Sequence, residues 1–154
     1  MFGPSDLPVP LGAIWGFVAL QYHTLILNRV YVVCVGTDSL IGLVGRGIVA
    51  QPVLVAEAMF NPTWWPRRAK LLKYPPLQFA DQAVVSAASA NFRVSFGDVE
   101  SITYTADKKW GMGTVPYSGR IFIGVGGKAR EFILLGREDG RAVCNRLRQA
   151  CGVA

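Results

Sequence analysis

Apolar positions are dense in the first third of the chain, and their spacing predicts a β-rich start. Residues 11–20 form an uninterrupted apolar run, and the surrounding segment 13–27 fits a helix and a strand equally well. The segment 29–35, RVYVVCV, is rich in β-branched residues and predicts a strand. A turn at 36–39 separates it from a second predicted strand at 40–49, where three glycines indicate a bend or a bulge.

The segment 50–91 has a different character and predicts an excursion from the sheet. AEAMF at 56–60 favours a helix, and the alanine-rich stretch 78–90 predicts a further helix. The excursion has too few apolar residues to form a core of its own. We therefore expect a single domain over 1–154, with an N-terminal lead-in at 1–28 and a partly helical insertion at about 50–91.

Alternating patterns return in the second half of the chain and predict further strands. These strands are expected at 91–96, 99–105, 120–125 and 129–135. In the second of them, VESITYT, the alternation does not indicate which face is buried. A terminal helix is predicted from Asp139, a suitable N-cap, to Cys151, with Gly152 placed to end it.

The sequence GVGGK at 124–128 raises the question of a phosphate-binding loop. A Walker loop requires glycine where Phe122 stands and Ser or Thr where Ala129 stands, so that motif is excluded. The dinucleotide pattern G-x-G-x-x-A does match, but it requires a following helix and then a parallel strand, for which the chain leaves no room. Gly126 and Gly127 therefore predict a tight hairpin turn between two strands.

Composition and charge narrow the classes of function. Hydrophobic residues make up 51% and charged residues 17% of the 154-residue chain, a balance that argues against long disordered tracts. The formal net charge of +6 favours anionic partners, which are lipid headgroups, nucleic acid or acidic proteins.

The cysteines and the start of the chain bear on its compartment. Cys34, Cys144 and Cys151 form no Cys-x-x-Cys pair, and the single histidine argues against a zinc site. An odd cysteine count without framework spacing fits a reducing compartment and predicts a cytoplasmic location. The start lacks the basic region of a signal peptide, and the apolar run at 11–20 is too short to cross a bilayer. We expect 11–27 to be a buried element or a segment that touches a membrane surface.

The second half of the chain resembles the pleckstrin-homology (PH) superfamily in the order of its elements: NFRVSFGDVESITY, GRIFIGVGGKAREFILL and EDGRAVCNRLRQAC. The closer likeness is to GRAM domains and bacterial PH-like domains, whose D-[IV]-x-x-[IV] step is similar to residues 98–102. Residues 29–49 would supply the opening hairpin. The resemblance implies an α+β, mostly β fold, a PH-like barrel of two bent antiparallel sheets capped by a C-terminal helix. It implies no catalytic chemistry, because members bind lipids, bind proteins or assemble into rings.

Two features depart from the pattern of that family. The excursion at 50–91 is long for such a fold. The first hairpin offers only Arg29 and Arg46 as cations, whereas phosphoinositide-binding members cluster several there. The second departure argues against specific phosphoinositide recognition.

The stretch 64–74, WWPRRAKLLKY, is the strongest candidate for a functional surface. It combines large aromatic residues with four cations and contains no acid. Its candidate ligand-binding residues are Trp64, Trp65, Arg67, Arg68, Lys70 and Lys73. Tryptophan favours the headgroup layer of a membrane, and each surface cation near an anionic leaflet contributes about 1 kcal/mol. The alternative interpretation is that the two tryptophans seal the core while the cations are simply solvated.

Other basic groups have simpler interpretations. One set is expected in an ordinary charged hairpin loop: Lys108, Lys109, Trp110 and Arg120. Another set is expected on the solvated face of the terminal helix: Arg141, Arg146 and Arg148.

The sequence contains few candidate catalytic groups. His23 stands among apolar residues, so we expect a buried, hydrogen-bonded histidine and not a base. Asp98 and Glu100 flank a turn and are expected to face water. The sequence contains no nucleophile elbow. We expect a protein that is not an enzyme and that carries no cofactor and no metal.

Three hypotheses follow for function. The leading one is a non-catalytic PH-like module that associates peripherally with an anionic membrane surface, at the inner face of the membrane, through residues 64–73. The alternative is a protein-interaction or homo-oligomerisation module whose apolar segment 11–27 is buried against a partner. Nucleic-acid binding is the least favoured, because the sequence contains no RNP-type motif.

Overall fold

The computed structural model describes residues 10–25, 27–49, 65–67, 78–112 and 115–154. The strands are β1 (Trp15–Thr24), β2 (Leu27–Val35), β3 (Ser39–Val49), β4 (Phe92–Ser95), β5 (Val99–Thr105), β6 (Tyr117–Val125) and β7 (Lys128–Leu135). The helices are α3 (Gln82–Ser86), the 3₁₀ turn η2 (Phe96–Asp98) and α4 (Gly140–Cys151). The helix expected at 56–60 and residues 1–9 of the lead-in expected at 1–28 fall outside the described residues, whereas Trp15–Thr24 of that lead-in form strand β1 of the sheet.

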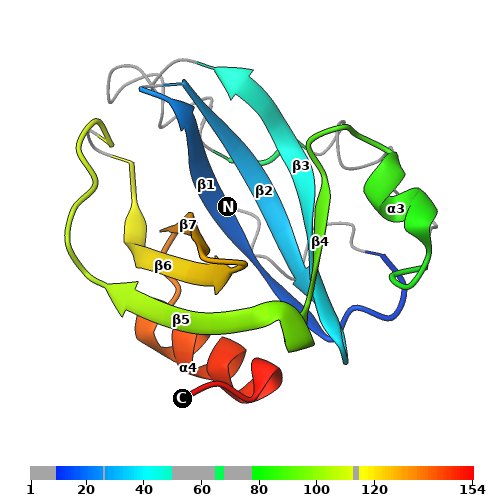
Figure 1. Ribbon diagram of the computed structural model, residues 1–154. Coiled ribbons are helices and arrows are strands. Elements are labelled where there is room, and N and C mark those ends of the chain that lie inside the picture. The colour runs from blue at the N-terminus through cyan, green and yellow to red at the C-terminus, as the bar shows by residue number, and fades with distance from the viewer. Residues whose placement is uncertain (1–9, 26, 50–64, 68–77, 113–114) are drawn as a thin grey trace.

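All seven strands are antiparallel and belong to one curled sheet in the order β4-β3-β2-β1-β7-β6-β5 (Figure 1). Strand β1 connects the two halves: it pairs with β2 along nearly its whole length, but with β7 only at Ala19 and Leu20. The short β1–β7 pairing lets β5–β7 turn steeply across β1–β3, and α4 lies below them. The predicted mostly β architecture with a C-terminal helix is confirmed, although the two expected sheets are one continuous sheet.

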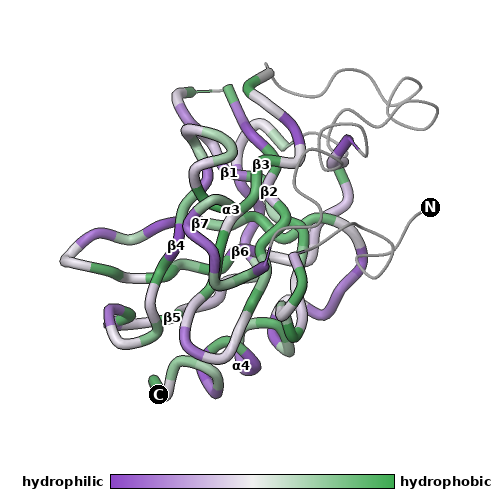
Figure 2. Tube along the Cα trace, turned by 90° about the vertical axis from the view of Figure 1, so that its right-hand side faces the viewer, coloured by the Kyte–Doolittle hydropathy of each residue, from purple (hydrophilic) through white to green (hydrophobic). Residues whose placement is uncertain are grey.

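The apolar run that fitted both a helix and a strand is strand β1, with Phe17–Leu20 buried. It shows no polar alternation because both of its faces are covered. Phe17 and Ala19 face an inner core between the curled sheet and α4, whereas Val18 and Leu20 face an outer core on the opposite side. Figure 2 shows the same hydrophobic concentration along the central strands β2 and β3. A sheet that is buried on both faces produces continuous apolar runs.

The described part of the excursion covers the outer face of β1–β3. Phe79 and Val84 are buried in the outer core, and Trp65 packs against it. The helix predicted at 78–90 is reduced to the five residues of α3. Only Val84 of α3 is buried, so packing supports a single turn, and isolated short helices are marginal even in alanine-rich sequences.

Two β-bulges explain patterns that alternation alone could not resolve. In β5, the register shifts between Val99 and Ser101, so Val99 and Ile102 both face the inner core although they stand three residues apart. In β3, the pairing passes from Val44 to Arg46 while its partner strand advances by one residue, which leaves Gly45 as the extra residue. The bend or bulge predicted from the glycines of 40–49 is confirmed.

The terminal hairpin and helix have the predicted form. Gly126 and Gly127 have φ of 59° and 73°, the positive values that a primed two-residue turn requires, and Val125 pairs with Lys128 across it. The Asp139 side chain accepts hydrogen bonds from the backbone N–H groups of residues 141 and 142, and Gly152 ends α4 in the left-handed conformation. The hairpin at one end of β7 and the capped helix α4 beyond its other end therefore fix the position of this strand.

Candidate functional site

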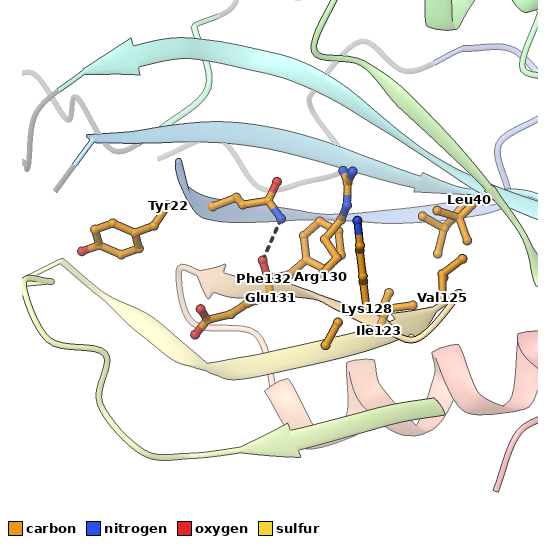
Figure 3. Close-up of a pocket in the computed structure, with 11 residues that line it drawn as sticks. Tyr22, Leu40, Ile123, Val125, Lys128, Arg130, Glu131 and Phe132 are labelled. Atoms are coloured by element: carbon orange, nitrogen blue, oxygen red, sulfur yellow. Dashed lines mark hydrogen bonds between the residues drawn. The ribbon is translucent and has the colours of Figure 1, made fainter. Parts of the chain in front are cut away.

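The inward-facing side of β7 changes character along its length. Phe132 and Leu134 are buried in the inner core, but Lys128 and Arg130, which share their face of the strand, are cations nearer the hairpin tip. These two cations line a groove of about 600 Å³ between the β6–β7 hairpin and the β3–β4 edge of the sheet (Figure 3). The groove opens where the curled sheet does not close, since β4 and β5 are its two edge strands.

Arg130 is held in the groove by an aromatic side chain. Its guanidinium carbon lies 3.7 Å from the ring centroid of Phe92, which in turn packs against Tyr31 and Phe132 at centroid distances of 5.3 and 5.9 Å. Burial lowers the pKa of Arg130, and the nearby Tyr31 partly offsets that effect. The Tyr31 hydroxyl also accepts a hydrogen bond from Arg29 at 3.4 Å, which places a further cation close by.

The one carboxylate that lines the groove points away from it. Glu131 is directed to the opposite side of β7 (Figure 3), where Lys109 Nζ lies 2.7 Å from Oε2 and Arg120 Nη1 lies 3.0 Å from Oε1. Among the described residues, no carboxylate forms an ion pair with Lys128 or Arg130. The groove therefore has a positive charge that its own carboxylate does not neutralise.

A second feature is a group of exposed apolar side chains at the β1–β2 hairpin end of the sheet, which we call the apolar end. Leu25 is 86% exposed and Trp110 is 81% exposed, and Leu27 and Ile48 are also exposed. Leu25 lies in the β1–β2 connection, Leu27 is the first residue of β2, and Ile48 lies on β3 beside the start of β2. The Tyr22 hydroxyl donates to the Trp110 carbonyl at 3.4 Å, which places the 106–112 loop at the same end.

Two of the six candidate ligand-binding residues predicted in the stretch 64–74 are described, and they have different environments. Trp65 is half-buried against the outer core, as the core-sealing interpretation expects, whereas Arg67 is exposed. The Arg67 backbone N–H donates to the Gly45 carbonyl at 2.8 Å, so the segment packs on the bulge of β3. A side chain at Gly45 would clash with Pro66, with Cβ atoms 2.7 Å apart. The other predicted residues lie outside the described residues: Trp64, Arg68, Lys70 and Lys73.

Arg46 is not the surface cation that the sequence suggested. The bulge at Gly45 turns it onto the outer face, where it is 2% exposed and donates to the side chain and the backbone carbonyl of Asn28. Burial, and then the nearby charge of Arg67, lower its pKa to about 10. The hydrogen bond from the Arg67 backbone to Gly45 places Arg67 beside the bulge of β3, next to the position of Arg46.

The structure also tests the predictions for His23, for the arginines of α4 and for the carboxylates Asp98 and Glu100. His23 is exposed and not buried, because it lies beyond the residues of β1 that pair with β7. The solvated-face prediction holds for Arg141 and Arg146, which are exposed although they lie over the Tyr104 and Trp15 rings. It fails for Arg148, which is half-buried and donates to the Ile102 carbonyl at 2.9 Å. Asp98 and Glu100 are exposed as predicted.

Lys128 and Arg130 were not among the candidate residues predicted from the sequence. The signal that could have found them is the alternation K-x-R-x-F-x-L over 128–134, which places two cations in line with two core residues once a strand is assumed. Within the described segments, no group of three or more His, Cys, Asp or Glu residues could hold a metal ion, and no helix is long and apolar enough to cross a membrane.

Comparison with known proteins identifies no relative of this chain. No protein-family model, no curated protein and no solved structure matches this chain.

Proposed function

We propose that this chain is a non-catalytic PH-like module that associates peripherally with anionic membrane surfaces at the cytoplasmic face. The fold supports the PH-like part of the proposal through its strand order and its C-terminal helix, which packs against β5 and β6. The resemblance implies two bent antiparallel sheets with a C-terminal helix; the chain has the helix and a bent antiparallel arrangement, but its strands form one continuous sheet.

The observation that carries the membrane part is the apolar end. Leu25 and Trp110 project large apolar side chains into water from two separate loops at one end of the sheet. Exposed aliphatic and aromatic side chains beside cations favour insertion into the headgroup layer. Fully burying a Leu side chain contributes about 1.5–3 kcal/mol, so partial insertion of two such side chains gives weak, reversible binding.

Two exposed cations support this part of the proposal. Lys108 stands two residues before Trp110, and Arg67 lies beside the bulge of β3, three residues before Ile48 of the apolar end. Each cation close to an anionic leaflet adds about 1 kcal/mol, and this contribution falls with salt. Arg68, Lys70 and Lys73 follow Arg67 in the sequence and enter the proposal from the sequence alone.

Co-sedimentation with vesicles tests this proposal. Vesicles of phosphatidylcholine with phosphatidylserine should bind the protein at low salt, and vesicles of phosphatidylcholine alone should not. The double variant Leu25→Ser/Trp110→Ser should reduce binding at least tenfold. A matched control is Leu11→Ser/Ile14→Ser, which removes two exposed apolar side chains from the other end of β1.

The outcome of the control decides the site. Equal loss in both double variants would mean that apolar surface in general drives adsorption, which contradicts the proposed site. Absence of binding to anionic vesicles at low salt would reject the membrane function itself. Neutralising Arg67, Arg68, Lys70 and Lys73 together tests whether the predicted patch contributes.

One observation supports the alternative function, which is self-association. Strand β4 is an edge strand of four residues, and its outer backbone groups could pair with a second copy. The expectation that 11–27 forms the interface is weakened, because Phe17–Leu20 are buried within the chain itself. Light scattering distinguishes this alternative, since a dimer should persist in the Leu25→Ser/Trp110→Ser variant.

A further inference from the structure

The outer edge of β4 carries backbone groups that the sheet does not use. Just beyond β4, the Phe96 N–H donates to the Asp38 carbonyl at 2.8 Å, in register with the β3–β4 pairing. Hydrogen-bonded pairs alternate along antiparallel strands, so every second residue back from Phe96 also bonds to β3. The backbone groups of the residues between them, Arg93 and Ser95, therefore point away from β3, on the side where β4 has no neighbouring strand (Figure 1).

This edge is accessible. Within the described part of the chain, no hydrogen bond uses the backbone groups that Arg93 and Ser95 direct outward. None of the four residues of β4 is buried, and Ser95 is exposed. The other edge strand, β5, is different, because α4 packs against it and Arg148 donates to the Ile102 carbonyl at 2.9 Å. Of the two edges of the sheet, that of β4 is therefore the one where an extended segment can pair.

A groove lies on each face of the sheet beside this edge. On the inner face, Val94 of β4 lines the groove of about 600 Å³ that also contains Lys128 and Arg130. On the outer face, Arg93 and Ser95 line a second groove of about 480 Å³. The side chains of an added strand alternate between the two faces, so they would enter the two grooves in turn. Backbone pairing combined with sites for alternate side chains is the recognition mode called β-augmentation.

The inner groove favours negatively charged side chains. Lys128 and Arg130 project into it from β7, whereas Glu131 is directed away (Figure 3) and is already paired. Within the described residues, neither of these two cations forms an ion pair. The Arg130 guanidinium carbon lies 3.7 Å from the ring centroid of Phe92, which belongs to β4 itself. The positive charge is therefore located beside the free edge, where the side chains of an added strand would meet it.

The outer groove is polar and close to neutral. The charged residues among its described lining are one cation, Arg93, and one carboxylate, Asp38. Arg93 is already hydrogen-bonded to the Ser39 hydroxyl at 3.2 Å and to the Phe79 carbonyl at 2.6 Å. Small polar side chains suit such a lining better than further charges do. The edge of β4 therefore lies between a positive groove and a neutral one.

We propose that the β4 edge binds an extended acidic segment of another protein by β-augmentation. Its acidic side chains face Lys128 and Arg130, and the alternate, small polar side chains face the groove beside Arg93. The unused backbone groups favour a peptide over a small anion, which has no backbone to pair with them. A second copy of this chain is disfavoured, because two paired β4 strands would bring their Arg93 side chains together in a chain of net charge +6. The site is separate from the apolar end, so the proposal does not rest on membrane association.

Nuclear magnetic resonance with the peptide acetyl-Thr-Glu-Thr-Glu-Thr-Glu-amide tests the proposal. In the free protein, the amide hydrogens of Arg93 and Ser95 should exchange rapidly with water. Addition of the peptide at millimolar concentration should slow the exchange of both at least fivefold. The same peptide with lysine in place of glutamate should bind at least tenfold more weakly.

Methylated peptides test the backbone pairing separately from the charge. One version carries N-methyl groups on the threonine nitrogens, and the other carries them on the glutamate nitrogens. Alternate N–H groups of a strand face the same neighbour. One of the two versions should therefore lose binding at least tenfold, and the other should bind like the unmethylated peptide.

Ser95→Pro tests the edge in the protein. Ser95 has a φ of −70°, which proline also adopts, and its N–H points away from β3, so the variant should fold. Proline removes one outward N–H group and obstructs an added strand, so binding of the acidic peptide should weaken at least tenfold. Ser95→Ala is the matched control, because it keeps the N–H group and should bind like the wild type.

Charge variants test the inner groove. Lys128→Gln/Arg130→Gln should weaken binding of the acidic peptide at least tenfold. The matched control Arg67→Gln/Arg137→Gln removes the same charge from two exposed positions outside both grooves and should bind like the wild type. If the first variant does not fold, Lys128→Glu provides the test, because Lys128 is exposed and the new carboxylate should repel the peptide.

Each alternative result overturns the proposal. Unchanged exchange at Arg93 and Ser95 with the acidic peptide, or equal binding of the lysine peptide, rejects the site. Equal affinities of the two methylated peptides mean that the backbone does not pair. Slow exchange of both amides without peptide, increasing with protein concentration, means that a second copy occupies the edge. Vesicle binding should be unaffected by Ser95→Pro, and peptide binding should be unaffected by Leu25→Ser/Trp110→Ser, so failure of one proposal is distinguishable from failure of the other.

Discussion

Lys109 Nζ lies 2.7 Å from Glu131 Oε2, and this ion pair connects the loop between β5 and β6 to the outward side of β7. Glu131 also pairs with Arg120 of β6 at 3.0 Å, and its backbone carbonyl accepts from Gln21 of β1. One residue thus contacts three neighbouring parts of the chain at the point where β1 and β7 diverge. The same arrangement holds Trp110, the residue after Lys109, at the apolar end.

Replacing Glu131 should loosen this loop more than it destabilises the fold. Glu131→Gln removes two partly exposed ion pairs, each of which contributes about 0.2–1 kcal/mol, so the free energy of unfolding should fall by about 1 kcal/mol. The loop should open more often once Lys109 is released. Trypsin should then cleave after Lys108 and Lys109 several-fold faster, which mass spectrometry of timed digests would measure.

Asp81→Asn is the matched control for this change. It removes one exposed carboxylate that makes no ion pair within the described residues, so its cleavage rate at Lys108 and Lys109 should equal that of the wild type. If Glu131→Gln also leaves the rate unchanged, the ion pair does not hold the loop.

The strand at 29–35 shows why part of this fold could be predicted from sequence. Val30, Val32 and Cys34 face the outer core, and Tyr31, Val33 and Val35 face the inner core. Burial on both faces requires a continuous run of β-branched and apolar residues, which the sequence displays directly. The hairpin at Gly126 and the cap at Asp139 were predictable for a similar reason, because local backbone geometry there requires specific residue types.

Local sequence patterns could not predict features that depend on contacts between residues distant in the sequence. The bulge at Gly45 rotates Arg46 onto the outer face, where Asn28 accepts its hydrogen bonds, and alternation would have placed Arg46 beside Val44 on the inner face. The groove also depends on how steeply the β6–β7 hairpin turns against β3 and β4. That angle follows from the two-residue pairing between β1 and β7, which no local pattern specifies.

The β6–β7 turn offers a direct test of backbone conformation. Gly126→Ala and Gly127→Ala should each lower the free energy of unfolding by about 1–2 kcal/mol, because left-handed backbone is costly for residues with a Cβ. No neighbouring atom would contact the added methyl group at either position, so no steric clash contributes to the loss. Urea denaturation gives the value.

Gly97→Ala is the matched control for the turn. A methyl group added at Gly97 would also meet open space, but the φ of Gly97 is not positive, so the substitution should be neutral or slightly stabilising. An equal loss of stability at position 97 would contradict the conformational explanation.

The N-terminus of α4 should depend on its capping carboxylate. The Asp139 side chain accepts from the backbone N–H groups of Arg141 at 3.0 Å and Ala142 at 3.1 Å. Asp139→Ala should therefore lower the free energy of unfolding by about 1 kcal/mol. Asp139→Asn keeps an acceptor oxygen and should lose less than half as much, and a difference too small to measure between the two variants would argue against the cap.

The three cysteines should differ in reactivity because they differ in burial. Cys34 lies in the outer core with no exposed surface, and burial raises its pKa from an ordinary value of 9.0 to about 12. The thiolate is the reactive form, so native Cys34 should not react with Ellman's reagent at pH 8. Cys151, which is partly exposed near the end of α4, should react first, and Cys151→Ser should remove that fast phase.

The raised pKa of Cys34 also predicts how stability changes at alkaline pH. Between pH 9 and pH 12 the unfolded chain loses the Cys34 proton while the folded protein keeps it, so the unfolded state binds fewer protons and stability falls as pH rises. Cys34→Ala removes this titration, and its urea midpoint should therefore decline less steeply than that of the wild type from pH 8.5 to pH 10.5. Parallel declines would show that Cys34 does not keep its proton in the folded protein over this range.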